Sequence, residues 1–206
     1  MKLDIQRIFP TSIFCFDDVL EQEYIDSMKD DIISQSKINA EHRQANWQSV
    51  KNNKLYELPK YKELGKMALN ACIKYIDLLE YKLDDIKLTG MWSNILKPGE
   101  MHKPHTHSNN LLSGVFYVQS DEGANIQMYD PRPQADVLRP QPKKYTKENS
   151  SIWFFPSITN RMILFPSWLQ HLVPINQSKN DRISIAFNFM LKGKIGSEHN
   201  YQSAEF

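Results

Sequence analysis

Apolar side chains recur at helical spacing in two segments of the first 85 residues. Residues 17–37 carry one such stripe, and Asp17 or Asp18 offers an N-cap at its start. Residues 60–82 carry the stronger stripe, which begins behind a proline. We therefore expect two helices, preceded over residues 3–16 by two short strands or an extended edge segment.

From residue 86 onward the pattern changes to short apolar runs. These runs are rich in Ile, Val, Phe, Tyr and Trp, and Pro, Gly, Asn and Asp separate them. Their number and spacing predict a mainly β, α+β fold, a jelly roll or barrel-like double sheet that the two helices brace on one face. The expected strands are 86–97, 101–107, 111–119, 124–130, 151–155, 161–165, 169–174 and 181–191.

These elements fit a single domain of 206 residues. Its parts are a mainly helical segment (1–85), a β core (86–191) and a polar tail (192–206) that we expect to be frayed. Residues 131–150 are rich in proline and basic side chains, which predicts a long loop. A long loop inside a compact domain often covers a binding site, so we expect this one to act as a lid.

Charge and cysteine content exclude several classes of protein. The 25 Lys and Arg against 24 Asp and Glu leave a formal charge of +1, which gives no overall attraction for nucleic acid or an anionic membrane. No apolar run has the length of a bilayer span, and the start of the chain lacks the apolar segment of a secretory signal. Cys15 and Cys72 indicate two reduced thiols in the cytoplasm. A homodimer stays open.

Three of the six histidines fall within residues 101–108. On a strand, His105 and His107 would point to the same face, whereas His102 would point to the other. His171 lies in another expected strand, which could run beside the first. Any one of these histidines alone would be read as a surface or hydrogen-bonded residue. Together, His105, His107 and His171 predict a facial site with open positions, suited to Fe(II), Zn(II), Mn(II) or Cu(II).

The strand over residues 181–191 alternates cleanly and carries a cation on its polar face. Arg182 and Ser184 share that face, where a guanidinium is costly unless an anion meets it. The guanidinium fork with a nearby hydroxyl would grip a carboxylate well. The alternative is an edge-strand arginine paired with Asp181 or a nearby glutamate.

The order HTH (105–107), SGVFYV (113–118), YDPR (129–132), LFPSWLQH (164–171) and DRISIAFNF (181–189) resembles the iron(II)/2-oxoglutarate-dependent oxygenases. It looks most like small bacterial and phage-borne members related to prolyl hydroxylases. The resemblance spans roughly residues 90–191 and implies a double-stranded β-helix that uses Fe(II), 2-oxoglutarate and O2.

Residue by residue, the resemblance implies two histidine ligands and an oxo-acid pocket. His105 and His171 take the places of the two histidine ligands. Arg182 takes the place of the residue that binds the distal carboxylate of 2-oxoglutarate, and Ser184 and Tyr117 match residues that can share it. His107 departs from the pattern, because the family at large has an aspartate or glutamate there.

The histidine at position 107 keeps a second enzyme class open. A neutral imidazole in place of a carboxylate makes the site more positive and changes its metal preference and redox poise. Cupin-type dioxygenases use three-histidine iron sites without an oxo acid, and the spacing from Gly99 to His105 fits the opening of a cupin signature. Residues 108–112 (SNNLL) lack the glutamate expected next, and Arg182 with Ser184 favours the oxo-acid pocket.

Four other polar residues are candidates for the pocket or for substrate contacts. They are Asn94 on the strand before the histidines, Asn188 on the strand of Arg182, and Asp130 and Arg132 at the start of the long loop, where these two could equally pair with one another.

The leading hypothesis is an enzyme that hydroxylates a C–H bond and releases succinate and CO2. The alternatives are a cupin-like three-histidine dioxygenase and a jelly-roll binding module without turnover. The prime substrate stays open between a protein side chain and a small metabolite.

Overall fold

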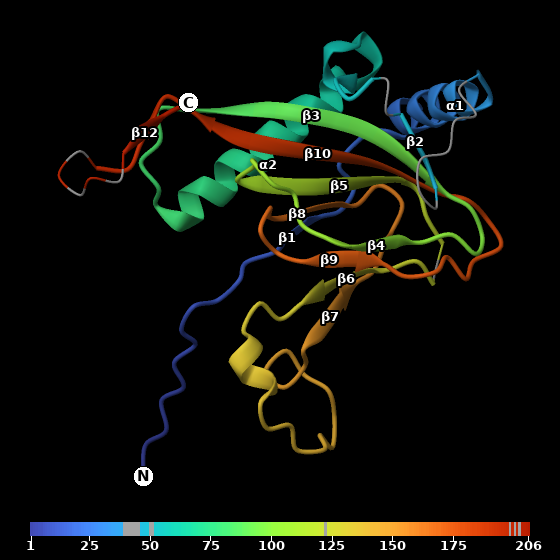
Figure 1. Ribbon diagram of the computed structural model, residues 1–206. Helices are drawn as coiled ribbons and strands as arrows, with labels where there is room; N and C mark the ends of the chain where they lie inside the picture. The colour runs from blue at the N-terminus through green and yellow to red at the C-terminus, as the bar shows by residue number, and fades with distance from the viewer. Residues whose placement is uncertain (39–45, 50–51, 122, 198, 200, 202) are drawn as a thin grey trace.

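The computed structural model describes residues 1–38, 46–49, 52–121, 123–197, 199, 201 and 203–206. Two large antiparallel sheets and two α-helices make up most of this part of the chain (Figure 1). The predicted class, mainly β with two helices, is therefore confirmed. Among the described residues, no helix is long and apolar enough to cross a membrane.

The larger sheet has six strands. Its central strands are long and almost wholly buried, which fits their near-continuous apolar sequence. In spatial order the strands are β1 (Phe14–Phe16), β8 (Met162–Pro166), β5 (Leu112–Gln119), β10 (Arg182–Lys192), β3 (Asp85–Leu96) and β2 (Trp47–Gln48).

The smaller sheet has four strands, in the order β4 (His102–His105), β9 (His171–Val173), β6 (Ile126–Tyr129) and β7 (Ile152–Phe155). From β3 to β10 the chain passes repeatedly between the two sheets, so that strands distant in sequence become neighbours. The predicted strand bounds are correct to within a few residues. One difference matters for the site: the strand expected over 101–107 ends at His105.

The two helices cover one face of the six-stranded sheet. Helix α1 (Gln22–Ile38) and helix α2 (Lys62–Leu79) contribute to a core that also contains Phe187 and Phe189 of β10. Two short 3-10 turns, η1 (Leu55–Glu57) and η2 (Pro59–Tyr61), lead into α2. In Figure 1 both helices lie on the side of this sheet away from β4, β9, β6 and β7.

The start predicted for the first helix is wrong. The helix begins at Gln22, and neither Asp17 nor Asp18 caps it. Asp18 has a φ of 52°, outside the helical region, and the Asp17 carboxylate instead accepts hydrogen bonds from Arg161 at 2.6 and 2.9 Å. The expected edge segment is confirmed, since Phe14–Phe16 form edge strand β1.

The alternation predicted along β10 is confirmed. Its side chains Ile183, Ile185, Phe187 and Phe189 lie in the helix-side core. Close packing there depends on Gly114 of β5, because a Cβ at this position would lie 2.2 Å from Cε2 of Phe187. The alternate residues of β10 face the four-stranded sheet, and a second, smaller apolar cluster fills part of that interior.

The segment 131–150 is a loop, as predicted, apart from the turn η3 (Pro133–Asp136). Its function as a lid stays a prediction. The expectation of a frayed tail is wrong for part of residues 192–206. Strands β11 (Lys194–Ile195) and β12 (Ala204–Glu205) pair, and the backbones of Gly193 and Phe206 exchange hydrogen bonds of 2.8 and 3.0 Å. Gly193, between β10 and β11, has a positive φ of 94°, which a glycine adopts without strain.

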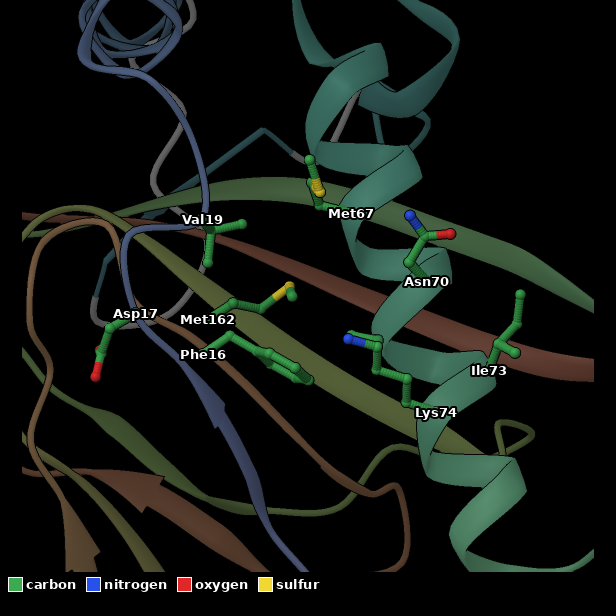
Figure 2. A pocket seen from close by; sticks show the side chains of 9 residues that line it. Phe16, Asp17, Val19, Met67, Asn70, Ile73, Lys74 and Met162 are labelled. Atoms are coloured by element: carbon green, nitrogen blue, oxygen red, sulfur yellow. The ribbon is translucent and has the colours of Figure 1, made fainter.

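A groove opens on the helix side of the molecule, between β1, β8 and α2 (Figure 2). Phe16, Met67 and Met162 form part of its apolar wall, with Asn70 and Lys74 on its helix side. Met162 belongs to the helix-side core, so this groove lies across the six-stranded sheet from the histidines.

Candidate metal centre

Three histidines meet in the interior between the two sheets. His105 of β4 pairs in register with His171 of β9, and their ring centroids lie 4.3 Å apart. The His107 ring stacks on that of His171 at 5.1 Å, with an interplanar angle of 17°. One ring nitrogen from each lies within 4.8 Å of the others, a spacing that one metal ion can bridge.

The position of His107 beside the other two histidines does not come from the strand alternation that its two-residue spacing from His105 predicts. Strand β4 ends at His105, so the two-residue alternation of a strand does not place His107. Its backbone N–H instead donates to the carbonyl oxygen of Ser167 at 2.9 Å, which ties the segment after β4 to the turn before β9. The predicted convergence is found, and a loop anchored by the backbone produces it.

Backbone carbonyl groups orient two of the rings. The Nδ1–H of His105 donates to the Lys103 carbonyl at 2.7 Å, and that of His171 donates to the Leu169 carbonyl at 2.9 Å. These bonds place the proton on Nδ1 and leave the Nε2 lone pair of each ring free. Such second contacts are typical of histidines that hold a metal.

Burial keeps the imidazoles of His107 and His171 in the form that binds metal. Removal from water lowers the pKa of His171 to about 3 and that of His107 to about 4. Both rings are therefore neutral near pH 7. The rings of Phe165 and Trp92 border them, with centroids 4.8 Å from His171 and 6.0 Å from His107. These side chains surround the donors with apolar surface.

The prediction that His102 points away from the other histidines is wrong. His102 pairs with Val173, two residues beyond His171, and the register shifts between His102 and His105. This β-bulge reverses the expected alternation, so His102 and His105 point to the same face. Their ring centroids lie 6.2 Å apart. His102 is not part of the three-histidine group.

A buried cation lies on the inner face of β10. Arg182 is 2 % exposed, its Nη1 donates to Ser184 Oγ at 3.1 Å, and its guanidinium carbon lies 4.9 Å from the centroid of the Tyr117 ring. Among the described residues no acidic side chain pairs with it, and the alternative pairing with Asp181 does not form. An arginine this deeply buried normally has an anionic partner.

Several polar atoms beside this guanidinium lack hydrogen bonds. Asn94, Ser184 and Tyr117 pair in register across β3, β10 and β5, so they share one face. Asn94 Oδ1, the Tyr117 hydroxyl and Arg182 Nε are buried without a partner within the described part of the chain. Burial raises the pKa of Tyr117, which keeps its hydroxyl protonated and able to donate. Unmet hydrogen-bonding groups so close together indicate a polar ligand.

The other candidate residues are already paired. Asn188 Oδ1 accepts a hydrogen bond from Ser113 Oγ at 2.8 Å, and Ser113 Oγ lies 2.7 Å from Ser167 Oγ. Asp130 and Arg132 bond to each other through two contacts of 2.9 and 2.8 Å. Of the two alternatives that the sequence allows for Asp130 and Arg132, contact with the pocket or substrate and pairing with one another, the structure shows the pairing.

Sequence reasoning missed two amides that contact His102. The side-chain nitrogens of Asn46 and Gln48 both hydrogen-bond to His102 Nε2, the second at 3.4 Å. They lie in or beside β2, a strand of two residues within a polar stretch, so no hydrophobic pattern could have marked them.

The arrangement defines a β protein with a candidate metal centre and a buried arginine between two sheets. Residues 90–188 match the protein family described as "Putative 2OG-Fe(II) oxygenase". These residues contain the three histidines, Arg182 and Ser184. Over this part of its sequence the chain is similar to the 2-oxoglutarate- and Fe(II)-dependent oxygenases. No curated protein matches the sequence.

Solved structures show the same fold at low sequence identity. A prolyl-4-hydroxylase from Pseudomonas putida is 11 % identical, with a TM-score of 0.58 over 87 % of this chain and 93 % of that one. The collagen prolyl hydroxylase of Paramecium bursaria Chlorella virus-1, in a 2-oxoglutarate complex, is 10 % identical, with a TM-score of 0.57 over 87 % and 96 %. HygX from Streptomyces hygroscopicus, with nickel and 2-oxoglutarate bound, is 10 % identical, with a TM-score of 0.57 over 95 % and 91 %.

Proposed function

We propose that the protein hydroxylates a C–H bond with Fe(II), O2 and 2-oxoglutarate, and that its two sheets form a double-stranded β-helix around the site. The passage of the chain between the sheets from β3 to β10 supports the β-helix. The observation that carries the proposed function is Arg182, a buried cation that has no acidic partner among the described residues and lies in the same interior as three converging histidines.

In this proposal His105, His107 and His171 hold the iron. The neutral rings of His107 and His171, and the free Nε2 lone pairs of His105 and His171, fit a divalent metal that accepts nitrogen donors. Three protein ligands leave coordination positions for the oxo acid and O2. When bound, iron supplies the oxidative chemistry in which substrate, O2 and 2-oxoglutarate give hydroxylated product, succinate and CO2.

Arg182, Ser184 and Tyr117 bind the distal carboxylate of 2-oxoglutarate. The free Nε–H of Arg182 and the free Tyr117 hydroxyl supply donors, and the Ser184 hydroxyl fixes the guanidinium. By holding one end of a five-carbon acid, these residues direct its keto-acid end toward the histidines. The chain's contribution is thus orientation and exclusion of water.

Asn94 and Asn188 line the same interior and contact substrate or co-substrate in this proposal. Asn94 is the stronger candidate, because its Oδ1 is buried and unpartnered, whereas Ser113 holds Asn188. Asp130 and Arg132 fix the start of the long loop through their mutual pairing. We also propose a cytoplasmic location, supported by the free thiols of Cys15 and Cys72. No second chain is needed to complete the proposed site, and a homodimer stays open.

The prime substrate is a protein side chain or a small metabolite. The similar structures include prolyl hydroxylases and HygX, the latter also crystallised with hygromycin B, and these names support both kinds of substrate as candidates. The histidine at position 107 does not overturn the assignment as a 2-oxoglutarate-dependent enzyme. A cupin-like enzyme needs no oxo acid, so it would not explain why Arg182 is buried with no acidic partner among the described residues.

The test is formation of succinate from 2-oxoglutarate by the Fe(II)-loaded protein in air without a prime substrate. We expect slow succinate release that His171→Ala abolishes. Arg182→Met should weaken 2-oxoglutarate binding by about 2–5 kcal/mol, the range for breaking a desolvated ion pair. Arg7→Met is the matched control, since Arg7 is exposed and forms a surface ion pair with Glu148 at 3.6 Å.

Two results would contradict the proposed function. Consumption of O2 with a metal-dependent product but no dependence on any oxo acid would favour the cupin-like dioxygenase. Failure to bind a divalent metal would favour a jelly-roll binding module instead.

A further inference from the structure

A fourth histidine lies in the interior between the sheets, outside the metal group. The bulge in β4 turns His102 toward the same side as His105. The charges that act on His102 are, in order of size, those of Arg182, His105 and His171. His102 therefore lies beside the three converging histidines, with its ring centroid 6.2 Å from that of His105, and the charge of Arg182 acts on its ring.

Two amides fix the protonation of the His102 ring. The side-chain nitrogens of Asn46 and Gln48 can only donate, so His102 Nε2 accepts both hydrogen bonds. Burial and the Arg182 charge lower the pKa of His102 to about 3, and the ring is neutral near pH 7. A neutral imidazole that accepts at Nε2 carries its proton on Nδ1. No described residue accepts a hydrogen bond from that Nδ1–H.

The groups around His102 favour an anionic acceptor for its Nδ1–H. The neighbouring charged and titratable groups are Arg182 and two histidines, and no carboxylate of the described residues acts on the ring. Gln48 pairs in register with Asn94, whose neighbour Ser184 contacts Arg182. The Nδ1–H donor of His102 thus adjoins the interior face between Arg182 and the three histidines. A dicarboxylic oxo acid bound at both ends would span this face.

We propose that His102 is a specificity-determining residue that donates its Nδ1–H to a carboxylate oxygen of the 2-oxo acid, with Asn46 and Gln48 as positioning residues. This inference rests on the proposed function. It assigns a third anchor to the co-substrate, besides the metal and Arg182. A neutral donor suits this place, because it adds a hydrogen bond without adding a positive charge beside Arg182.

The test is calorimetric binding of 2-oxoglutarate to the Ni(II)-loaded protein, a metal with which HygX was crystallised. His102→Leu removes the donor at similar volume and should weaken binding about 10- to 100-fold. His102→Asn keeps an amide N–H close to the place of Nδ1 and should stay within about threefold of the wild type. Ni(II) affinity without oxo acid should change less than about twofold in both variants.

A second ligand distinguishes the two carboxylates. 2-Oxobutyrate has the keto-acid end but no distal carboxylate. If His102→Leu weakens 2-oxobutyrate and 2-oxoglutarate by the same factor, the bond goes to the carboxylate beside the keto group. If only 2-oxoglutarate weakens, the bond goes to the distal carboxylate. Both results support a role for His102 as an anchor.

The inference and the proposed function fail in different ways. If His102→Leu binds 2-oxoglutarate like the wild type while Arg182→Met does not, the role of His102 is wrong and the proposed function stands. If Leu and Asn at this position weaken binding equally, the effect comes from packing and the inference is overturned. If neither His102→Leu nor Arg182→Met changes binding, the proposed oxo-acid site itself is wrong.

Discussion

The two faces of the six-stranded sheet use the same strands but bury different chemistry. On β10, Phe187 and Phe189 pack against the helix-side core, whereas Arg182 and Ser184 face the four-stranded sheet. Toward the helices, burial removes apolar surface from water and stabilises the fold. Toward the other sheet, it leaves polar groups without partners, each at a cost of about 1–3 kcal/mol. One face holds the fold together, and the other, which we call the ligand face, lines the proposed site.

Acid should destabilise the ligand face most strongly. Burial lowers the pKa of His102 and His171 to about 3 and of His107 to about 4, below the usual 6.5 of an unfolded histidine. Between pH 6.5 and 4 the unfolded chain therefore binds more protons, so stability falls as pH falls. Each histidine contributes at most about 1.4 kcal/mol per pH unit. Urea unfolding of the metal-free protein from pH 7.5 to 4.5 measures the slope.

The control for this pH dependence is His102→Leu, which removes one of the three buried rings. We expect its slope against pH to be shallower by about one proton. The same slope in both proteins would show that carboxylates, rather than buried imidazoles, dominate the response.

On the helix face, Phe187→Ala should cost about 3–5 kcal/mol, because it leaves a cavity in a close-packed core. Phe187 is fully buried and lies against Gly114, where little space exists for repacking. Denaturant unfolding measures the loss. Metal affinity of the folded fraction should equal that of the wild type, and a large loss of that affinity would mean that the two faces are not independent.

At the metal, His107→Asp should change the coupling between metal and oxo acid. If three imidazoles hold the iron, as we propose, a bound dianion would balance much of the iron charge, so 2-oxoglutarate should raise metal affinity, and by linkage the metal should raise oxo-acid affinity equally. A factor of about 5–150 is typical of such coupling. With an aspartate, metal affinity alone should rise and the coupling should shrink. Titrations with no coupling in the wild type, and no effect of the substitution, would exclude His107 as a ligand.

The sequence predicts the helix face better than the ligand face. The strand bounds and the alternation of β10 follow from hydrophobic periodicity, and so does the placement of Arg182 opposite the apolar residues. His102 was assigned to the wrong side because a β-bulge, which periodicity does not reveal, adds a residue to β4. Asn46 and Gln48 escaped notice because β2 exists only through its pairing with β3. The contacts of these polar side chains depend on residues that are distant in sequence, so no periodic pattern in the sequence predicts them.

The smallest effect should come from a paired arginine at the sheet edge, which contrasts with the unpaired one in the interior. Arg161 forms two hydrogen bonds to Asp17, whose side chain is 53 % exposed, and thereby joins the end of β1 to the start of β8. Arg161→Met should cost about 0.2–1 kcal/mol, the range for exposed ion pairs, and less in high salt. The hydrogen bonds from Arg161 lower the pKa of Asp17, so this small contribution is present above the unfolded pKa of the carboxyl and is lost as pH falls below it. Arg182→Met, in contrast, removes a buried charge that has no acidic partner among the described residues, and it should leave stability unchanged or higher while 2-oxoglutarate binding weakens. Denaturant unfolding measures the stability of the two variants, and calorimetry measures their binding of 2-oxoglutarate. The contrast is wrong if Arg161→Met also weakens 2-oxoglutarate binding or if Arg182→Met unfolds the metal-free protein.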